Sequence, residues 1–170
     1  LPTASAIRGV ISPPSESATT MPTGPMMTSV LRHATQTGFS PVAAFFAPAL
    51  IIAAVADAFE AGVMPRCHLE DITRSDIYGF VIPFCFELMK VGAEYGIPVK
   101  IRACDTMGYG VNFPGAVIPR SVQGIIYAIH KHAGVPHELI EWHGHNDFYK
   151  AVSNSTTAWL YGCSGINTSL

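Results

Sequence analysis

The feature that most constrains the fold is an alternation of short apolar runs with helical patterns, which begins near Ala53. Strand-like runs at 64–71, 97–106 and 137–145 recur at about 30–40 residues per unit, and a fourth opens at 165–170. Such alternation implies a parallel sheet with right-handed crossovers. We therefore predict an α/β fold, which is either a (β/α)8 barrel or an open doubly wound sheet.

Helical segments are expected between these runs. Ser75 or Asp76 is suited to cap the second of them, Pro83 should kink it or mark its true start, and Gly96 should end it. The expected segments are 53–63, 73–96, 120–134 and 147–163.

Polar side chains gather where the expected strands end, at Glu70-Asp71, Asp105-Thr106 and His143–Asp147. Barrels and open sheets both bind ligands at that edge, so this clustering leaves both architectures open. No G-x-G-x-x-G motif follows a strand, so the main sign of a dinucleotide-binding fold is absent from the sequence.

Residues 1–52 differ in character from the rest of the chain. They are rich in Ser, Pro, Ala and Thr and have weak apolar periodicity, which is typical of an irregular segment. We therefore divide the chain into an irregular region, 1–52, and a catalytic-type domain, 53–170. The abrupt change at Ala53 also suggests a disrupted reading frame as a hypothesis.

Composition excludes several classes of protein. The net charge is −2 without a basic block, so no nucleic-acid partner is expected. The apolar run 43–56 is shorter than a membrane span and contains Pro48, so no membrane association is expected. Scattered cysteines without a CxxC pair indicate free thiols and a cytoplasmic location. They are Cys67, Cys85, Cys104 and Cys163.

Two histidines stand two apart at the end of the third expected strand. In a strand, His143 and His145 point to one face, where two imidazoles suit Zn²⁺, Mn²⁺ or Fe²⁺ with an added carboxylate. A hydrogen-bonded pair of partly buried histidines is the alternative. Asp147 could orient an imidazole from the second shell or cap the next helix, and Asn146 could face the site or turn the chain.

The first expected strand places Arg66, His68 and Glu70 on one face. A guanidinium there suits a substrate carboxylate, although an ion pair of Arg66 with Glu70 or Asp71 is equally compatible with the pattern. Thr106 ends the second strand and either offers its hydroxyl to substrate or caps the strand. Cys104, two residues earlier, is better explained as a packed core thiol than as a nucleophile.

The motifs "LEDITRSD", "ACDTMGYG" and "HGHND", in this order, resemble those of the DRE-TIM metallolyases, the 2-isopropylmalate synthase and homocitrate synthase group. The longer strings around them most resemble the branch that includes Re-type citrate synthases. The resemblance covers roughly residues 53–170. It implies a (β/α)8 barrel, of which this chain would carry about strands five to eight.

The resemblance also implies a chemistry. Members condense acetyl-CoA with a 2-oxo acid that a divalent metal chelates, and a base first forms the enolate of the thioester, which is hydrolysed afterwards. Mn²⁺, Mg²⁺ or Zn²⁺ would be the cofactor, the reaction would serve amino-acid biosynthesis, and the full-length parent would be a homo-oligomer. By position, the metal ligands are His143 and His145, and Arg66 and Thr106 match substrate-site residues.

Two further assignments follow from the resemblance. Glu70 matches an acidic residue of the active-site mouth and is the candidate catalytic group, whereas His68 replaces a common serine and is assigned to substrate binding. The Asp-Arg-Glu motif of the family's first strand is absent from this sequence. The expectation is therefore an incomplete synthase that is inactive alone; an aldolase or lyase of the same superfamily, or a non-catalytic fragment, are the alternatives.

We expect the chain to self-associate when it is expressed alone, because half a barrel leaves strand edges unpaired and apolar faces uncovered. Light scattering should show oligomers or aggregates. A monodisperse monomer that melts cooperatively in calorimetry would contradict this expectation.

Overall fold

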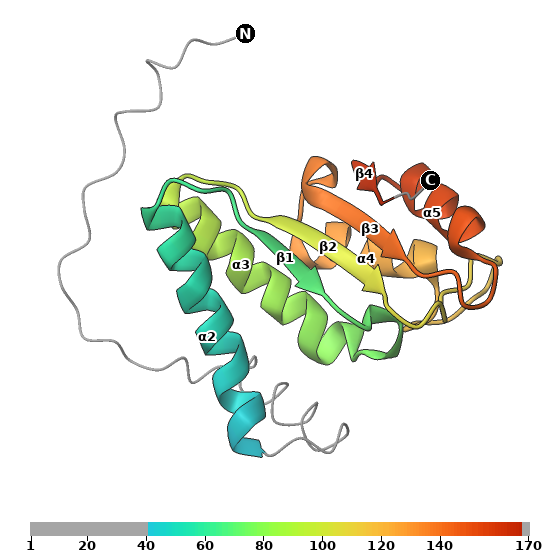
Figure 1. Cartoon of the computed structure of the whole chain (residues 1–170), viewed down its shortest axis with the longest axis horizontal. Helices are drawn as coiled ribbons and strands as arrows, with labels where there is room; N and C mark the ends of the chain where they lie inside the picture. Colours follow the sequence, from blue (N-terminus) through green and yellow to red (C-terminus); the bar gives the residue numbers. More distant parts are fainter. Residues whose placement is uncertain (1–40, 168–170) are drawn as a thin grey trace, which may run out of the picture.

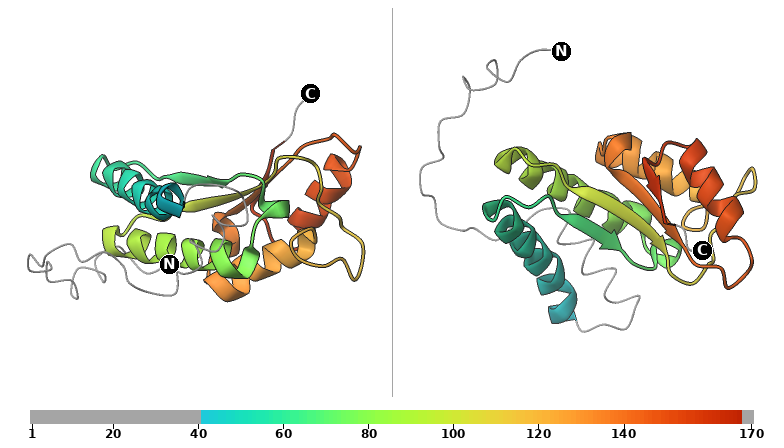
Figure 2. Two further views of the ribbon diagram at one scale, coloured as in Figure 1. Left: turned by 90° about the horizontal axis from the view of Figure 1, so that it is seen from below. Right: turned by 45° about the horizontal axis from the view of Figure 1, so that its top comes forward.

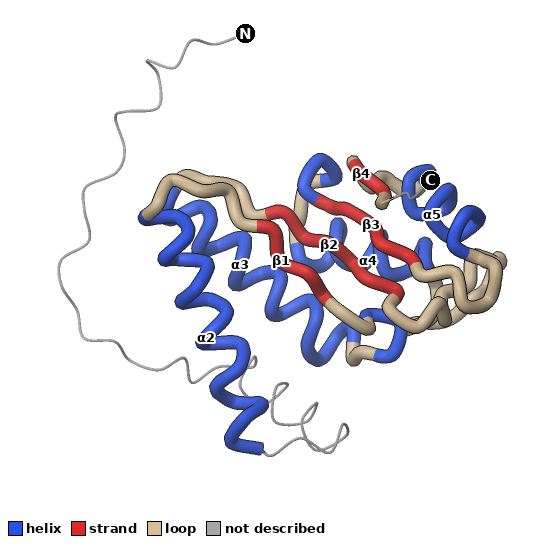
Figure 3. The backbone as a smooth tube through the Cα atoms, in the orientation of Figure 1, coloured by secondary structure: helices blue, strands red, loops and turns tan. Residues whose placement is uncertain are grey.

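Four parallel strands form the centre of the molecule. The computed structural model describes residues 41–167, with side chains from Pro48 onward. Strands β1 (Arg66–Leu69), β2 (Lys100–Asp105), β3 (Ile140–Gly144) and β4 (Gly165–Ile166) make one sheet in sequence order, and every pair is parallel (Figures 1 and 3). The predicted α/β class and parallel sheet are confirmed.

The helices are distributed as in a barrel segment. They are α2 (Pro41–Glu60), α3 (Ile82–Tyr95), α4 (Val122–Ala133) and α5 (Ala151–Leu160). Both α3 and α4 lie on one side of the strands, whereas α2 lies beside β1 and α5 beside β4 (Figures 1 and 2). A doubly wound sheet would reverse its strand order and place helices on both faces. The sequential order therefore fits the predicted partial (β/α)8 barrel, while its numbering as strands five to eight stays a prediction.

One side of each strand is apolar and faces the helices. In β1, Cys67 and Leu69 are buried while Arg66 and His68 are exposed. The same alternation puts fully buried apolar side chains of β2 and β3 against α3 and α4, as a sheet with one covered face requires. The largest of these core side chains include Leu88, Ile101, Ile125, Ile129, Ile140 and Trp142.

Helix α2 begins at Pro41, so the predicted start of this helix at Ala53 is wrong. The apolar residues 41–52 belong to the same helix, which contains Pro48. This helix crosses the proposed boundary at 52/53, which stays a prediction because residues 1–40 lie outside the described part. Within the described residues, no helix is long and apolar enough to cross a membrane.

The predicted helix 73–96 is divided into shorter elements. A 3-10 turn, η2 (Ile72–Arg74), and a π-helical turn, η3 (Ile77–Val81), precede α3. Asp76 caps η3, since its Oδ1 accepts the Gly79 N–H at 2.8 Å. Pro83 lies in the first turn of α3, where its missing N–H costs no helical bond, so it marks the true start.

The third strand and the following helix both start later than predicted. A 3-10 turn, η4 (His137–Leu139), occupies the first residues of the expected strand. Helix α5 begins at Ala151, whose N–H donates to Asn146 Oδ1 at 3.1 Å. The alternative that Asp147 caps this helix is therefore wrong, because Asn146 supplies the oxygen.

A buried carboxylate holds the loops at the C-terminal edge of the sheet. Asp105 is fully buried, and it accepts hydrogen bonds from Thr73 Oγ1 at 2.8 Å and from the Gly110 N–H at 2.9 Å. A Cβ on Gly110 would lie 2.7 Å from Asp105 Oδ2, so only glycine allows this approach. Asp105 thereby fixes η2 and the loop after β2 next to the strand ends.

Replacing Leu88 by alanine should lower the free energy of unfolding by about 3 kcal/mol, because it opens a cavity under the sheet. Leu88 is fully buried, whereas Leu160, at the end of α5, is 77% exposed. The matched control Leu160→Ala should change stability by less than about 0.5 kcal/mol. Urea unfolding followed by the fluorescence of buried Trp142 measures both, and equal losses would contradict the assignment of the core.

Candidate functional site

The face of the sheet opposite α3 and α4, which we call the open face, carries the polar side chains of the strands. Cys104 of β2 is the register partner of His143 of β3. Glu70 follows Leu69, which is paired with Ala103, and so lies level with Cys104. Glu70, Cys104 and His143 thus form a row across three strands near their C-terminal ends, where the sequence placed the site.

His143, in β3, and His145, just after this strand, lie together as predicted. Their ring centroids are 5.0 Å apart and their planes are inclined at 74°. His143 Nδ1 lies 3.2 Å from Asn167 Oδ1. In the tautomer that donates from Nδ1 to this amide oxygen, Nε2 is the ring nitrogen whose lone pair is free to bind a metal.

The side chain that orients an imidazole is Asn167, which the sequence analysis did not single out. Asn167 follows β4, and its N–H donates to Trp142 O at 3.1 Å, so strand pairing brings it beside His143. Asn146 uses its oxygen on α5 instead, and Asp147 Oδ2 lies 4.0 Å from His145 Nδ1, beyond hydrogen-bond length. Roles of Asn146 and Asp147 around a metal stay predictions.

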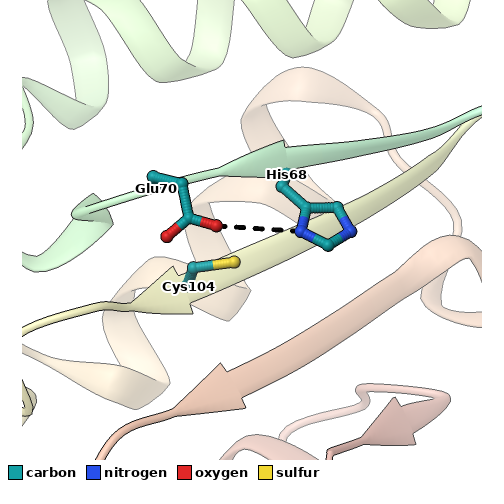
Figure 4. A group of neighbouring side chains, drawn as sticks. All are labelled: His68, Glu70 and Cys104. Atoms are coloured by element: carbon teal, nitrogen blue, oxygen red, sulfur yellow. Dashed lines mark ion pairs between the residues drawn. The ribbon is translucent and has the colours of Figure 1, made fainter.

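A second set of metal-ligating groups lies next to the histidine pair. His68, Glu70 and Cys104 have ligand atoms within 4.8 Å of one another, the one such group of three among the described residues. Figure 4 shows the imidazole, the carboxylate and the thiol converging from β1 and β2, with His68 Nδ1 3.7 Å from Glu70 Oε1. His68 and Glu70 are exposed, and Cys104 is buried beneath them.

Glu70 is held by the hydroxyl of Thr106. Thr106 Oγ1 donates to Glu70 Oε2 at 2.7 Å and accepts the Asp71 N–H at 2.8 Å. The hydrogen bond from Thr106 is the main reason that the pKa of Glu70 lies below its ordinary value. Glu70 is therefore an ionised, oriented carboxylate at neutral pH, while the hydroxyl proton of Thr106 is engaged by Glu70.

Cys104 is a buried thiol, as the sequence analysis favoured. Burial raises its pKa to about 12, and the negative charge of Glu70 adds to this effect. The side chain is therefore protonated at neutral pH, which argues against a role as a nucleophile. All four cysteines are free and buried.

Arg66 is engaged by Glu141 of β3. Its Nε lies 3.0 Å from Glu141 Oε2, and its Nη2 donates to Oε1 at 3.1 Å. The proposed alternative, an ion pair with Glu70 or Asp71, is wrong, since Asp71 pairs with Arg74 three residues on. No local pattern indicates the actual partner, Glu141, which lies 75 residues away along the chain.

Glu141 joins three strands. Besides Arg66 of β1, its carboxylate accepts hydrogen bonds from Lys100 Nζ at 3.1 Å and Arg102 Nη2 at 2.7 Å, both of β2. Burial raises the pKa of Glu141, but the bonds from Arg102 and Lys100 outweigh it and hold the pKa below its ordinary value. We call these four residues the Glu141 cluster.

A cavity of about 440 Å³ lies beside β1. Its lining includes Ser75 and the open-face side chains Arg66, His68 and Glu70, and its apolar part comes from α2, β1, η3 and the start of α3. The predicted substrate residues of β1 therefore border one space, which a small ligand can enter.

The fold and this strand-end site together define a segment of a (β/α) barrel that carries ligands for a divalent metal. No protein-family profile matches the chain. It is 65% identical over 113 residues to the Citrate (Re)-synthase of Clostridium kluyveri, which covers 66% of this chain and 25% of that protein. The corresponding protein of Syntrophus aciditrophicus is 62% identical over 111 residues, or 65% of this chain and 18% of that protein.

A more distant relative is the 2-phosphinomethylmalate synthase of Streptomyces hygroscopicus, 34% identical over 71% of this chain and 28% of that protein. The matched segment is thus homologous to Re-citrate synthase and related synthases of the DRE-TIM family, which confirms the resemblance. The chain spans about a quarter or less of the length of the first two relatives.

Among solved structures, the carboxyl transferase domain of Rhizobium etli pyruvate carboxylase with oxamate and biotin is similar to this chain. The TM-score is 0.49 at 15% identity, over 83% of this chain and 23% of that one. This overlap is too weak to carry an argument about the fold, which rests on the strand order described above.

Replacing Glu141 by glutamine should destabilise the chain by about 3 kcal/mol at neutral pH, because three cations then face one another without a counter-charge. The native pKa is below the ordinary 4.5, so this stabilisation is present above pH 4.5 and is lost as the pH falls through the lowered value. Urea unfolding at a series of pH values measures it.

The control for this variant is Glu94→Gln, at an exposed position of α3. This variant should have the free energy of unfolding of the wild type at neutral pH. It should also lose stability in acid over the same pH range as the wild type. An E141Q chain as stable as the wild type at neutral pH would show that the Glu141 cluster does not support the sheet.

Proposed function

We propose that this chain forms the metal- and substrate-binding side of a synthase that condenses acetyl-CoA with a 2-oxo acid. The observation that carries the proposal is the pair of imidazoles on one face at the end of β3, in a segment 65% identical to a Citrate (Re)-synthase. Because the chain spans a quarter of that relative, the activity is proposed for the whole protein that contains it.

His143 and His145 would hold the divalent metal, Mn²⁺, Mg²⁺ or Zn²⁺. Their fit is supported by the contact of His143 Nδ1 with Asn167 Oδ1 at 3.2 Å, which orients the ring so that Nε2 is the nitrogen on offer to a cation. Two imidazoles suit such a metal when a carboxylate completes the set. When bound, the metal would polarise the oxo group of the 2-oxo acid as a Lewis acid.

Glu70 is the proposed catalytic group. An ionised carboxylate level with His143 is able to accept a proton from the acetyl methyl group, and the bond from Thr106 orients it for that task. The low pKa makes Glu70 a weak base, so the reaction depends on the acidity that the thioester gives its methyl protons.

Arg66, His68 and Thr106 are the proposed substrate-binding residues. They lie on the open face around Glu70, and the side chain of Arg66 is 45% exposed although it pairs with Glu141. Arg66 holds the carboxylate of Glu141 in a two-point contact. The same planar guanidinium has the geometry to orient the carboxylate of a 2-oxo acid.

The His143→Ala variant of the whole protein should release thiol from acetyl-CoA about a hundredfold or more slowly, because metal Lewis-acid catalysis supplies several kcal/mol. The assay pairs acetyl-CoA with oxaloacetate, 2-oxoglutarate, pyruvate or 2-oxoisovalerate and reports release that depends on the 2-oxo acid. In the 170-residue chain, Mn²⁺ binding followed by electron paramagnetic resonance should weaken in parallel.

His132→Ala is the matched control, since His132 is an exposed histidine at the end of α4, a helix that lies on the side of the sheet opposite the open face. It should keep both thiol release and Mn²⁺ affinity. Equal Mn²⁺ binding by wild type and His143→Ala would remove the ligand role, and thiol release independent of any 2-oxo acid would refute the condensation.

A further inference from the structure

We propose that His68, Glu70 and Cys104 form a binding site for a thiophilic divalent cation, Zn²⁺, separate from the histidine pair of β3. The three residues offer one nitrogen, one oxygen and one sulfur ligand atom, all within 4.8 Å of one another. This donor set suits Zn²⁺, which accepts imidazole, carboxylate and thiolate in one site, and it suits the harder Mg²⁺ poorly because of the sulfur.

The imidazole and carboxylate of this set have nearly the spacing of a bound site, and the thiol lies within 4.8 Å of both. Bond lengths of about 2.0–2.3 Å at tetrahedral angles place neighbouring ligand atoms about 3.3–3.6 Å apart. His68 Nδ1 and Glu70 Oε1 are 3.7 Å apart, so closure on a cation requires small side-chain movements of this pair. Because His68 and Glu70 alternate on one face of β1 and Cys104 lies level with Glu70 on β2, strand pairing brings all three together.

Neighbouring residues prepare the carboxylate for a cation. Thr106 donates to Glu70 Oε2, and the Asp71 N–H fixes the Thr106 hydroxyl, so Oε1 is the oxygen turned toward His68. Hydrogen bonds of this kind orient metal ligands in known sites. Cys104 binds as the thiolate, and its proton leaves to solvent when the Zn–S bond forms.

The nearest positive charge does not block the site. Arg102 Nη1 lies 3.5 Å from His68 Nε2, on the ring nitrogen that does not face Glu70. The charge of Arg102 is balanced by Glu141, whose Oε2 accepts from Arg102 Nη2 at 2.7 Å. With the Arg102 charge compensated in this way, the carboxylate of Glu70 supplies the negative charge for the cation.

The three ligands come from β1, from the residue that follows it and from β2, so this site is complete within the described residues. His68 and Glu70 also line the cavity beside β1, which leaves a fourth position open to water. The site needs no further protein ligand, in contrast to the histidine pair, and the inference does not rest on the proposed function.

Cobalt(II) is the probe for this site, because a cysteine thiolate bound to Co²⁺ gives a charge-transfer band in the near ultraviolet that imidazole and carboxylate ligands do not give. Titration of the reduced 170-residue chain with Co²⁺ should produce this band, with saturation at one equivalent, and added Zn²⁺ should remove it. Cys104→Ser should abolish the band. His68→Ala, at an exposed position, should weaken Co²⁺ binding about tenfold or more, and Thr106→Val about tenfold.

Two variants serve as controls. Cys163→Ser removes another buried thiol, and His143→Ala removes a ligand of the site proposed for catalysis; both should keep the band. Circular dichroism verifies that each variant is folded. The proposal is overturned if the wild type gives no band, if the band survives Cys104→Ser, if it is lost with Cys163→Ser, or if the folded His68→Ala chain binds Co²⁺ as the wild type does. Loss of the band in folded His143→Ala would likewise overturn a separate site.

Discussion

The carboxylate of Glu141 with its three cations is the interaction on which the open face depends. Arg66, Lys100 and Arg102 reach it from two other strands, at N–O distances of 2.7–3.1 Å. A nearly buried carboxylate is costly unless it is paired, so the contacts favour one register of β1, β2 and β3. That register sets Glu70, Cys104 and His143 side by side, and every chemical argument about the site begins there.

The strand ends then carry two adjacent sets of metal ligands with different character. The imidazoles of His143 and His145 lie at the end of β3, where Asn167 contacts His143. His68, Glu70 and Cys104 instead come from the end of β1 and from β2, and they include sulfur. The set that contains sulfur suits a thiophilic cation such as Zn²⁺, whereas a set without sulfur also suits harder cations. Glu70 links them, because it is the proposed base of the condensation and also a proposed ligand for Zn²⁺, so the two uses compete for one carboxylate.

Much of this arrangement could be predicted from the order of residues along the chain. Alternation of strands and helices predicted the parallel sheet, and the spacing of His143 and His145 predicted a shared face, because both follow from backbone geometry. The partner of Arg66 could not be predicted, since Glu141 lies on another strand and nothing local favours it over Glu70. Asn167 was missed for the same reason. The early start of α2 was missed because prolines and alanines are frequent among the residues before Ala53, which is not typical of a regular helix.

The α/β class, the strand-end position of the polar residues and the family could be inferred from the chain alone, because periodicity and motifs are properties of neighbouring residues. Three contacts emerge only from the folded molecule: Asn146 accepts the Ala151 N–H at the start of α5, Thr106 holds Glu70, and Cys104 meets His68 and Glu70. These contacts depend on which strands pair and in which register. That register is set by the summed packing and charge of segments far apart in the chain, which no single stretch of residues contains.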